Sequence, residues 1–403
     1  MVVQCEVIEP RWNRAAAAVA VMLVVVSTLS ATVWADASRG DYTFFVQAWE
    51  NLTARDGLYV YRWMPNIQSG PVSLLGYGLA DLLGHGGFLV VVAALGLVAV
   101  GVIARWGAVL GRPLSVIAVG GVVVALQWRG LATWGHLDDG LVLVATIVSL
   151  DCIRRDRRDM PVLLLGLSLA IKPWAILFVP LLLGASGPWH KRLRPPAASC
   201  VIGALFWAPF IIATTDTLDG MRPIVLVAPD SIVHLFTRQA LTELPPAVRI
   251  VQLTLGVAAV TWTVVRRRPS CALLVGVAVR LLFEAGTWPY YTIALVLGAF
   301  VWDVIESRSR VPWATLAASV LIFPPWWFDA PDLRASMRLV ACLGALELAR
   351  RTATRPPIPL FGAPGSTLAG SAQSVVASDA QPPDQLDAGR NPRTIVQGIP
   401  SQV

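Results

Sequence analysis

The chain has 403 residues, of which 32 are Lys or Arg and 25 are Asp or Glu, and its formal net charge is +7. Only 14% of the residues are charged and 56% are hydrophobic, whereas a soluble protein carries roughly 25% charged residues. A soluble fold of this length cannot hide so much apolar surface. The composition therefore excludes a water-soluble enzyme, a disordered chain and a disulfide-stapled one, and it predicts a polytopic membrane protein.

Apolar segments long enough to cross or enter a bilayer run through most of the chain, since a crossing needs about 20 mainly apolar residues, or fewer when neighbours bury it. The predicted crossings are 15–35, 86–104, 113–126, 137–150, 161–171, 174–185, 197–213, 247–265, 270–282, 289–305, 311–323 and 334–349. Residues 71–83 are expected to form a shorter helix on the membrane or partly in it. The predicted fold is an all-α polytopic membrane helix bundle with about 11–13 transmembrane helices.

The basic residues test this topology independently, because Lys and Arg stay on the cytoplasmic side. Most of them fall in alternate loops. These residues are Arg11, Arg14, Arg105, Arg112, Arg154, Arg155, Arg157, Arg158, Lys191, Arg192, Arg194, Arg266, Arg267, Arg268, Arg308, Arg310, Arg350, Arg351 and Arg355. The alternation predicts a multi-pass protein of the plasma membrane with both termini in the cytoplasm.

The domain organisation follows from these segments. Residues 1–14 are expected to be a cytoplasmic N-terminus and residues 15–350 a transmembrane domain, with outer loops at 36–70 and 214–246. Residues 351–403 are rich in Pro, Gly, Ser, Ala and Gln and have little to bury, so a disordered cytoplasmic tail is expected. The segment 15–35 could instead be a cleaved signal peptide, but its apolar run is longer than usual and its loss would break the alternation.

The first outer loop mixes acidic and aromatic residues, and its segment 41–52 has helical spacing with Phe45, Trp49 and Leu52 on one face. Asp41 lies at the start of this helix, just after the first crossing. A carboxylate there could take a proton from a substrate hydroxyl at the membrane surface. The alternative is that Asp41 only caps the helix.

A second polar group follows the third crossing in LQWRGLATWGHLDDGLVL, which contains Trp134, His136, Asp138 and Asp139. Ionisable groups at the mouth of a membrane helix are costly, so a functional site is their default interpretation. The alternative is a polar cap in which an Asp starts the next helix. His with two carboxylates could also bind a divalent metal, but without a fixed ligand spacing a metal is not supported.

Lys172, in LSLAIKPWAILF, is one of only two lysines and lies between two apolar segments at their outer turn. A cation there suits a lipid-linked phosphate, although a snorkelling lysine without a ligand is the alternative. In the long outer loop, residues 231–241 are expected to form a short helix with His234 and Arg238 on one face. Those two side chains could hold a phosphate or simply form a solvated face. Arg280 and Glu284 are expected to neutralise each other.

The order of these features resembles the C-superfamily of polytopic glycosyltransferases, in particular the family 87 mannosyltransferase-like proteins of actinobacteria. The features are Asp41, an LYVY stretch at 58–61, QSGPVSLL at 68–75, the helix mouth GHLDD at 135–139 and the turn AIKPWA at 170–175. Leu137 stands where relatives often have Pro, and a DxD motif is absent. The resemblance covers roughly residues 15–350.

The resemblance implies an integral-membrane hexosyltransferase of the cell envelope. It would move a sugar from a polyprenyl-monophosphate donor to a glycolipid or glycan on the extracytoplasmic face, with inversion and without a cofactor. Mannose is the preferred sugar and arabinofuranose the second candidate. Asp41 matches the catalytic acidic residue of the first loop. The residues expected to bind substrate or donor are His136, Asp138, Asp139, Lys172, His234 and Arg238. No nucleic-acid partner is expected. The alternatives are a polytopic lipid or sugar transporter and a catalytically inactive scaffold of the same fold.

Overall fold

The computed structural model describes Met22 and residues 40–54, 56–64, 67–184, 188–220, 225–238, 241–323 and 328–356. The chain divides into two compact units, Met1–Phe361 and Gly362–Val403, and every described residue belongs to the first. The predicted crossing 15–35 lies outside the described residues except for Met22, and so does most of the predicted tail. The last helix extends to Ala353, so the bundle continues three residues into the segment that the sequence assigned to the tail.

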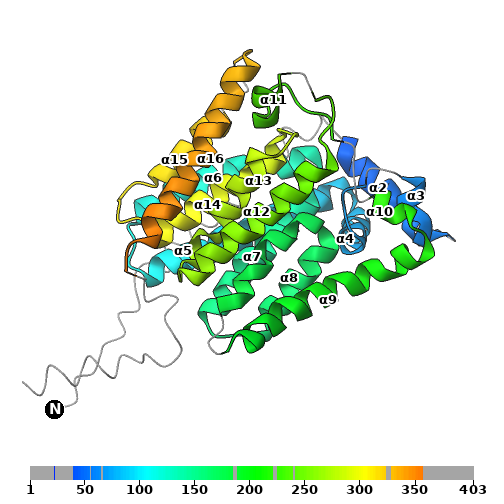
Figure 1. Ribbon diagram of the computed structural model, residues 1–403, viewed down its shortest axis with the longest axis horizontal. Helices are drawn as coiled ribbons and strands as arrows, with labels where there is room; N and C mark the ends of the chain where they lie inside the picture. Colours follow the sequence, from blue (N-terminus) through cyan, green and yellow to red (C-terminus); the bar gives the residue numbers. More distant parts are fainter. Residues whose placement is uncertain are drawn as a thin grey trace, which may run out of the picture. The chain divides into compact units, whose positions relative to one another are not determined.

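Helices make up nearly all of the described chain (Figure 1). The longer ones are α2 (Gly40–Thr53), α4 (Pro71–Asp81), α5 (Gly84–Val109), α6 (Leu114–Trp134), α7 (Leu137–Arg154), α8 (Asp159–Ile171), η3 (Pro173–Gly184), α9 (Trp189–Ala213), α12 (Pro246–Val265), α13 (Ala272–Leu282), α14 (Pro289–Ile305), α15 (Trp313–Ile322) and α16 (Pro331–Ala353). The short ones are η2 (Gly57–Tyr59), α3 (Val60–Trp63), α10 (Asp216–Gly220), α11 (Ile232–Thr237) and η4 (Pro269–Cys271). An isolated antiparallel bridge joins Leu226 to Glu243.

The all-α prediction is confirmed for the described residues, and each predicted crossing within them falls on a helix. Four helices, α5, α6, α9 and α12, are long and apolar enough to cross a membrane by length and composition. The segment predicted over 174–185 is a 3₁₀ helix, η3, with Pro180 inside it. Proline cannot donate a backbone hydrogen bond, and a tighter winding is one consequence of such local strain.

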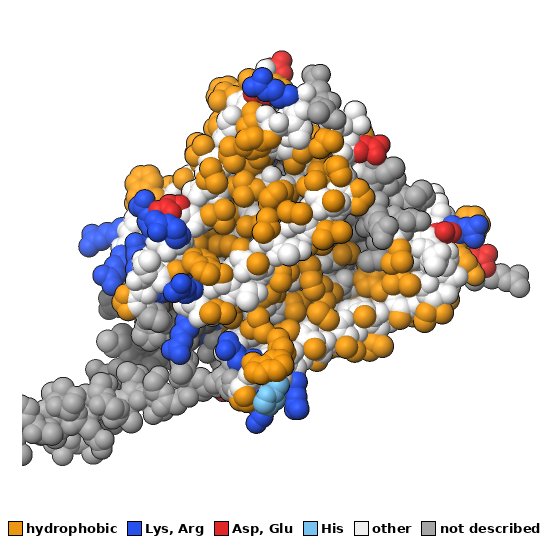
Figure 2. Space-filling model, in the orientation of Figure 1, with side chains coloured by type: hydrophobic (Ala, Val, Ile, Leu, Met, Phe, Trp, Pro, Cys, Tyr) orange, Lys and Arg blue, Asp and Glu red, His pale blue; other side chains and the backbone are white. Residues whose placement is uncertain are grey.

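The bundle has a buried centre and an apolar outer face. Nearly every residue of α13 and α14 is buried, as expected for helices that are apolar all round. On α9 and α12, by contrast, large side chains such as Leu205 and Ile250 are exposed. Figure 2 shows hydrophobic side chains spread over this face, with most Lys and Arg gathered along one side of it. An apolar surface of this extent is suited to lipid rather than water.

Helix α2 packs against another helix of the bundle and does not lie free of it. On α2, Phe45 stacks on Tyr77 of α4 with ring centroids 4.6 Å apart, and Trp49 lies directly against Gly78 of α4. The predicted aromatic face of α2 therefore covers another helix of the protein. This contact fixes the position of the start of α2, where Asp41 lies.

Basic residues at the ends of α5 and α7 and directly after α12 form two networks with acidic residues. Asp151 near the end of α7 accepts hydrogen bonds from Trp106 and Arg154 and pairs with Arg105. Directly after α12, Arg268 pairs with Glu306 at 2.9 Å, and both side chains are buried. These two networks join the ends of neighbouring helices to one another.

Gly298 marks the closest approach of α13 and α14. A Cβ atom at this position would lie 2.7 Å from the Cα and N atoms of Leu274, and backbone atoms cannot move aside as a flexible side chain can. We expect Gly298→Ala to force the two helices apart and to lower the free energy of unfolding by about 1–3 kcal/mol, measured by reversible denaturation in mixed micelles.

Gly344 on α16 is the matched control, because a Cβ atom there would meet nothing within 4 Å. Gly344→Ala should leave stability unchanged or raise it by about 0.5–1 kcal/mol, since Ala is the better helix former. Equal effects of the two substitutions would contradict the proposed close approach.

Candidate functional site

The turn between α6 and α7 lies against the start of α2 and brings it to the N-terminus of α7. Gly135 ends α6 with φ = +76°, a conformation that glycine adopts without strain. A Cβ atom there would lie 2.5 Å from the backbone N of Tyr42, so α2 docks directly on the turn. As a result, the Asp41 carboxylate lies 3.1 Å from Nε2 of His136.

The other ring nitrogen of His136 faces two buried carboxylates. Nδ1 lies 3.3 Å from Asp138 Oδ1 and 3.3 Å from Asp139 Oδ2. The ammonium of Lys172 lies 2.9 Å from Asp138 Oδ2 and 2.6 Å from Asp139 Oδ2. Five residues predicted from three distant segments therefore meet in one place. We call Asp41, His136, Asp138, Asp139 and Lys172 the charge cluster.

The charge cluster is buried except at one point. His136, Asp138, Asp139 and Lys172 are all buried, whereas the side chain of Asp41 is 44% exposed. Buried charges are tolerated only where they are paired and hydrogen-bonded, and this cluster meets that condition. Asp41 is thus the point at which the network reaches the surface.

Three residues that the sequence analysis did not single out hold the two carboxylates and the turn that precedes them. Ser69 donates a hydrogen bond to Asp138, and the indole N–H of Trp174 donates to Asp139 Oδ1 at 3.1 Å. The hydroxyl of Tyr77 donates to the carbonyl of Gly135 at 2.8 Å and accepts the N–H of Leu137 at 3.0 Å. Trp174 lies two residues after Lys172 in the sequence and could have been suspected. Ser69 lies in the QSGPVSLL stretch, where it was given no role, and Tyr77 lies too far from the acids along the chain for any spacing to reveal it.

Two aromatic rings enclose His136. Its imidazole stacks on Tyr290 with ring centroids 3.4 Å apart and an angle of 18° between the rings. Phe45 approaches the imidazole edge-on at 5.6 Å. The ring of His136 is therefore held in one orientation, with one nitrogen toward Asp41 and the other toward the buried carboxylates.

The pKa of His136, in the turn between α6 and α7, is raised from 6.5 to about 9. Burial is the largest influence and acts to lower this pKa, as does the charge of Lys172. The hydrogen bonds to the three carboxylates of the charge cluster outweigh both. His136 is consequently a cation at neutral pH, and the charge cluster contains two cations and three anions.

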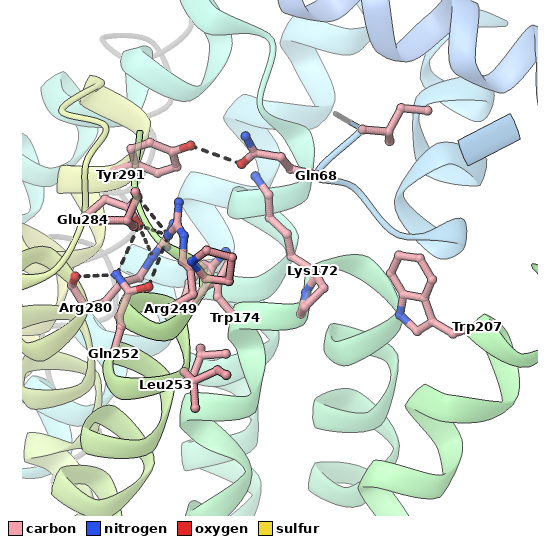
Figure 3. A pocket seen from close by; sticks show the side chains of 15 residues that line it. Gln68, Lys172, Trp174, Trp207, Arg249, Gln252, Leu253, Arg280, Glu284 and Tyr291 are labelled. Carbon is pink, nitrogen blue, oxygen red and sulfur yellow. Dashed lines mark hydrogen bonds and ion pairs between the residues drawn. The ribbon is translucent and has the colours of Figure 1, made fainter. Parts of the chain in front are cut away.

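A cavity of about 540 Å³ adjoins the charge cluster at Lys172 (Figure 3). It lies between the start of η3, the C-terminal part of α9, the start of α12 and the end of α13. Its lining combines polar and apolar side chains: Ile67, Gln68, Lys172, Pro173, Trp174, Trp207, Leu244, Pro246, Arg249, Ile250, Gln252, Leu253, Arg280, Glu284 and Tyr291.

Two arginines and one carboxylate form the polar wall of this cavity. Arg249 lies 2.9 Å from Glu284 Oε1, and Arg280 lies 3.3 Å from Glu284 Oε2. The guanidinium of Arg280 is also 4.3 Å from the ring centroid of Trp174, a cation–π contact. The predicted pairing of Arg280 with Glu284 is thus present, but Arg249 joins it and leaves one net positive charge on the wall.

The predicted helix over 231–241 is wrong in its extent. Helix α11 ends at Thr237, and Arg238 follows it with φ = +42°, so His234 and Arg238 do not share a helical face. At the start of α11, the side chain of Ser231 caps the helix by accepting a hydrogen bond from the backbone N–H of His234. Neither His234 nor Arg238 lines the cavity or contacts the charge cluster within the described residues.

His136, Asp138 and Asp139 offer ligand atoms within 4.8 Å of one another, a set that suits a divalent cation by its chemistry. However, the ammonium of Lys172 already contacts Oδ2 of Asp138 and Oδ2 of Asp139. A metal ion bound to these carboxylates would be repelled by the ammonium, so the carboxylates are better neutralised by Lys172 than by a metal. The expectation of a site without metal stays a prediction.

Comparisons with protein-family models, with curated proteins and with solved structures find no match for this chain. The resemblance to family 87 of the C-superfamily therefore stays a prediction. What the chain does has to be argued from the charge cluster and the cavity.

Replacing Lys172 would leave two buried carboxylates without a partner. We expect Lys172→Met to lower the free energy of unfolding by about 3–5 kcal/mol, the usual cost of breaking a buried ion pair from one side. The other lysine, Lys191, is exposed on α9, and Lys191→Met should change stability by less than about 0.5 kcal/mol. Denaturant unfolding in mixed micelles compares the two; a Lys172 variant as stable as the Lys191 variant would contradict the ion-pair geometry.

The raised pKa of His136 predicts a pH dependence of stability. A pKa that is higher in the folded than in the unfolded state stabilises the fold fully below about 6.5, and this stabilisation is lost as the pH rises through about 9. The thermal midpoint of the purified protein should therefore fall between pH 7 and pH 9.5. His136→Asn should flatten this fall, and His190→Asn, at an exposed position of α9, should retain it. An equal fall in both variants would show that another group is responsible.

Proposed function

We propose that the protein is an integral-membrane glycosyltransferase that moves a sugar, with mannose preferred, from a polyprenyl-monophosphate donor to a hydroxyl of an envelope glycolipid or glycan. One observation carries the proposal. A cation-lined cavity and a half-exposed carboxylate are joined through Lys172 and His136 in a continuous chain of contacts. Group transfer from a lipid phosphate needs a site that binds the phosphate anion and, close to it, a base that accepts the proton of the acceptor hydroxyl.

The cavity matches an amphiphilic phosphate. Lys172, Arg249 and Arg280 supply positive groups at its polar side, which suits a phosphate monoester or diester. Leu244 and Leu253 supply an apolar side, and Ile250 continues it onto the exposed face of α12. A polyprenyl tail can therefore leave the cavity along an apolar surface, while its phosphate stays with the cations.

The reaction we propose is a single displacement with inversion. The acceptor oxygen bonds to the anomeric carbon as the bond from that carbon to the phosphate oxygen breaks, and the electron pair departs with the polyprenyl phosphate. The hydroxyl proton passes to the Asp41 carboxylate, which acts as general base. Stabilising the departing phosphate is the main electrostatic task, and Lys172, Arg249 and Arg280 are placed for it.

This assignment changes the donor-binding residues inferred from the sequence. His234 and Arg238 lie away from the cavity, so we assign the leaving phosphate to Arg249 and Arg280 in their place. His136, Asp138 and Asp139 then serve to hold Asp41 and Lys172 at a fixed distance, rather than to bind the donor directly.

We place this site on the extracytoplasmic face of the plasma membrane, with both termini in the cytoplasm. The basic turns around Asp151 and Arg268 lie at the opposite end of the helices from the charge cluster, and the positive-inside rule assigns that basic end to the cytoplasm. The location at helix ends also favours an enzyme over a transporter, because a transporter keeps its ionisable groups near the bilayer midplane.

The role of Asp41 is tested by Asp41→Asn in proteoliposomes supplied with a polyprenyl-phosphate mannose and a glycolipid acceptor. Loss of a general base typically costs 10²–10⁴-fold in rate, so we expect kcat to fall by about that factor with donor binding retained. Asp56→Asn is the matched control, because Asp56 lies in the same outer segment and its side chain makes no capping hydrogen bond.

Unchanged turnover in the Asp41 variant would remove the base from the mechanism. Uptake of mannose into sealed proteoliposomes without any transfer product would instead favour the transporter alternative.

A further inference from the structure

Two segments of the chain run side by side next to Asp41 and touch each other through two pairs of rings. One segment is 134–136, at the end of α6, and the other is 288–290, at the start of α14. His136 stacks on Tyr290 at 3.4 Å. Two residues earlier in both segments, Trp134 meets Trp288 with ring centroids 4.5 Å apart.

The two ring pairs differ in exposure. Tyr290 and His136 are buried, and their pair forms part of the wall around the charge cluster. Trp134 is half-buried and Trp288 is 43% exposed. The tryptophan pair is therefore the outward continuation of the wall that holds His136, and through His136 it adjoins the half-exposed carboxylate of Asp41.

The residues next to both tryptophans are held by contacts with the rest of the protein. Thr287, directly before Trp288, donates a hydrogen bond to Asp230 at 2.6 Å, and Asp230 pairs with Arg338 of α16 at 2.8 Å. On the other segment, the turn at Gly135 packs against the backbone of α2. Two adjoining indole rings that are partly exposed beside a charged site form a surface suited to binding a ligand, because each ring offers an apolar face and a polar N–H.

We propose that Trp134 and Trp288 form the acceptor subsite, which binds a saccharide ring by stacking against its C–H face. This inference rests on the proposed function, in which Asp41 takes the proton of the acceptor hydroxyl. The donor cavity is lined by Lys172, whereas the tryptophan pair adjoins the ring pair of His136 and Tyr290 and is more exposed than that pair. The acceptor thus reaches Asp41 from the surface, while the lipid-linked donor reaches it from the cavity.

The competing role for exposed tryptophans is anchorage in the membrane interface. The two roles differ in what they bind: a subsite discriminates sugars, whereas an interfacial anchor responds to any amphiphile of the same tail length. Trp63 provides a matched control, since it is 62% exposed on α3 in the same outer region and contacts neither ring pair.

The test uses the full-length protein in nanodiscs without donor, with octyl α-mannoside as the acceptor probe and octyl phosphocholine as the tail probe. Saturation-transfer NMR measures the affinity for each. We expect Trp288→Ala to weaken binding of octyl α-mannoside about tenfold, and Trp288→Phe, which keeps a ring, to weaken it less than threefold. Trp63→Ala should leave it unchanged, and octyl phosphocholine should bind equally to all variants.

The proposal is overturned if Trp288→Ala binds octyl α-mannoside as the unsubstituted protein does, or if it loses both probes equally. Binding is measured without turnover, so this outcome is separable from the failure of the proposed function. If Trp288→Ala still transfers the sugar with an unchanged acceptor KM, the acceptor subsite is refuted and the proposed enzyme activity stands. If the unsubstituted protein binds the mannoside but transfers no sugar, the enzyme activity is refuted and only a saccharide-binding site at Trp134 and Trp288 remains.

Discussion

The ammonium of Lys172 lies between the carboxylates of Asp138 and Asp139, and the arrangement of this end of the bundle depends on the contact. The three groups come from two helix termini, Lys172 from the end of α8 and the two acids from the first turn of α7. Buried ions of this kind are stable only when all partners are present. The pairing therefore fixes how α7 and α8 meet, and it places the start of η3 beside them with Trp174 bonded to Asp139.

The same pairing has a consequence for ligand binding. Lys172 faces the cavity as well as the charge cluster, so an anion entering the cavity competes with two carboxylates for one ammonium. The charge cluster retains three anions for two cations when His136 is protonated, and this excess explains why the polar wall needs Arg249 and Arg280 in addition. Without them, a phosphate at Lys172 would face a local surplus of negative charge.

Sequence patterns predicted the helices well and the contacts between their ends only in part. Apolar runs located the longer helices from α4 to α9 and from α12 to α16, because burial in lipid or in the core demands such runs. They did not locate the short helices η2, α3 and α10. The cluster of His136, Asp138 and Asp139 with Lys172 was predictable because charge is rare in membrane helices, so each exception is informative. Ser69, Tyr77 and Arg249 were missed because serine, tyrosine and a loop-side arginine are common, and only the tertiary fold shows what they contact.

His234 and Arg238, which were predicted to share one face of a helix, show most clearly where arguments from residue spacing fail. An i and i+4 relation places two residues on one face only while the helix continues, and α11 ends one residue too early for that. Its end is set locally, by a serine cap at one terminus and a left-handed residue at the other. The cations that do meet at the cavity, Arg249 and Arg280, come from different helices, α12 and α13. A site at the ends of membrane helices is therefore assembled by the packing of those helices, and the loop between α13 and α14 contributes where it is tied to the bundle, as Thr287 is through Asp230 and Arg338.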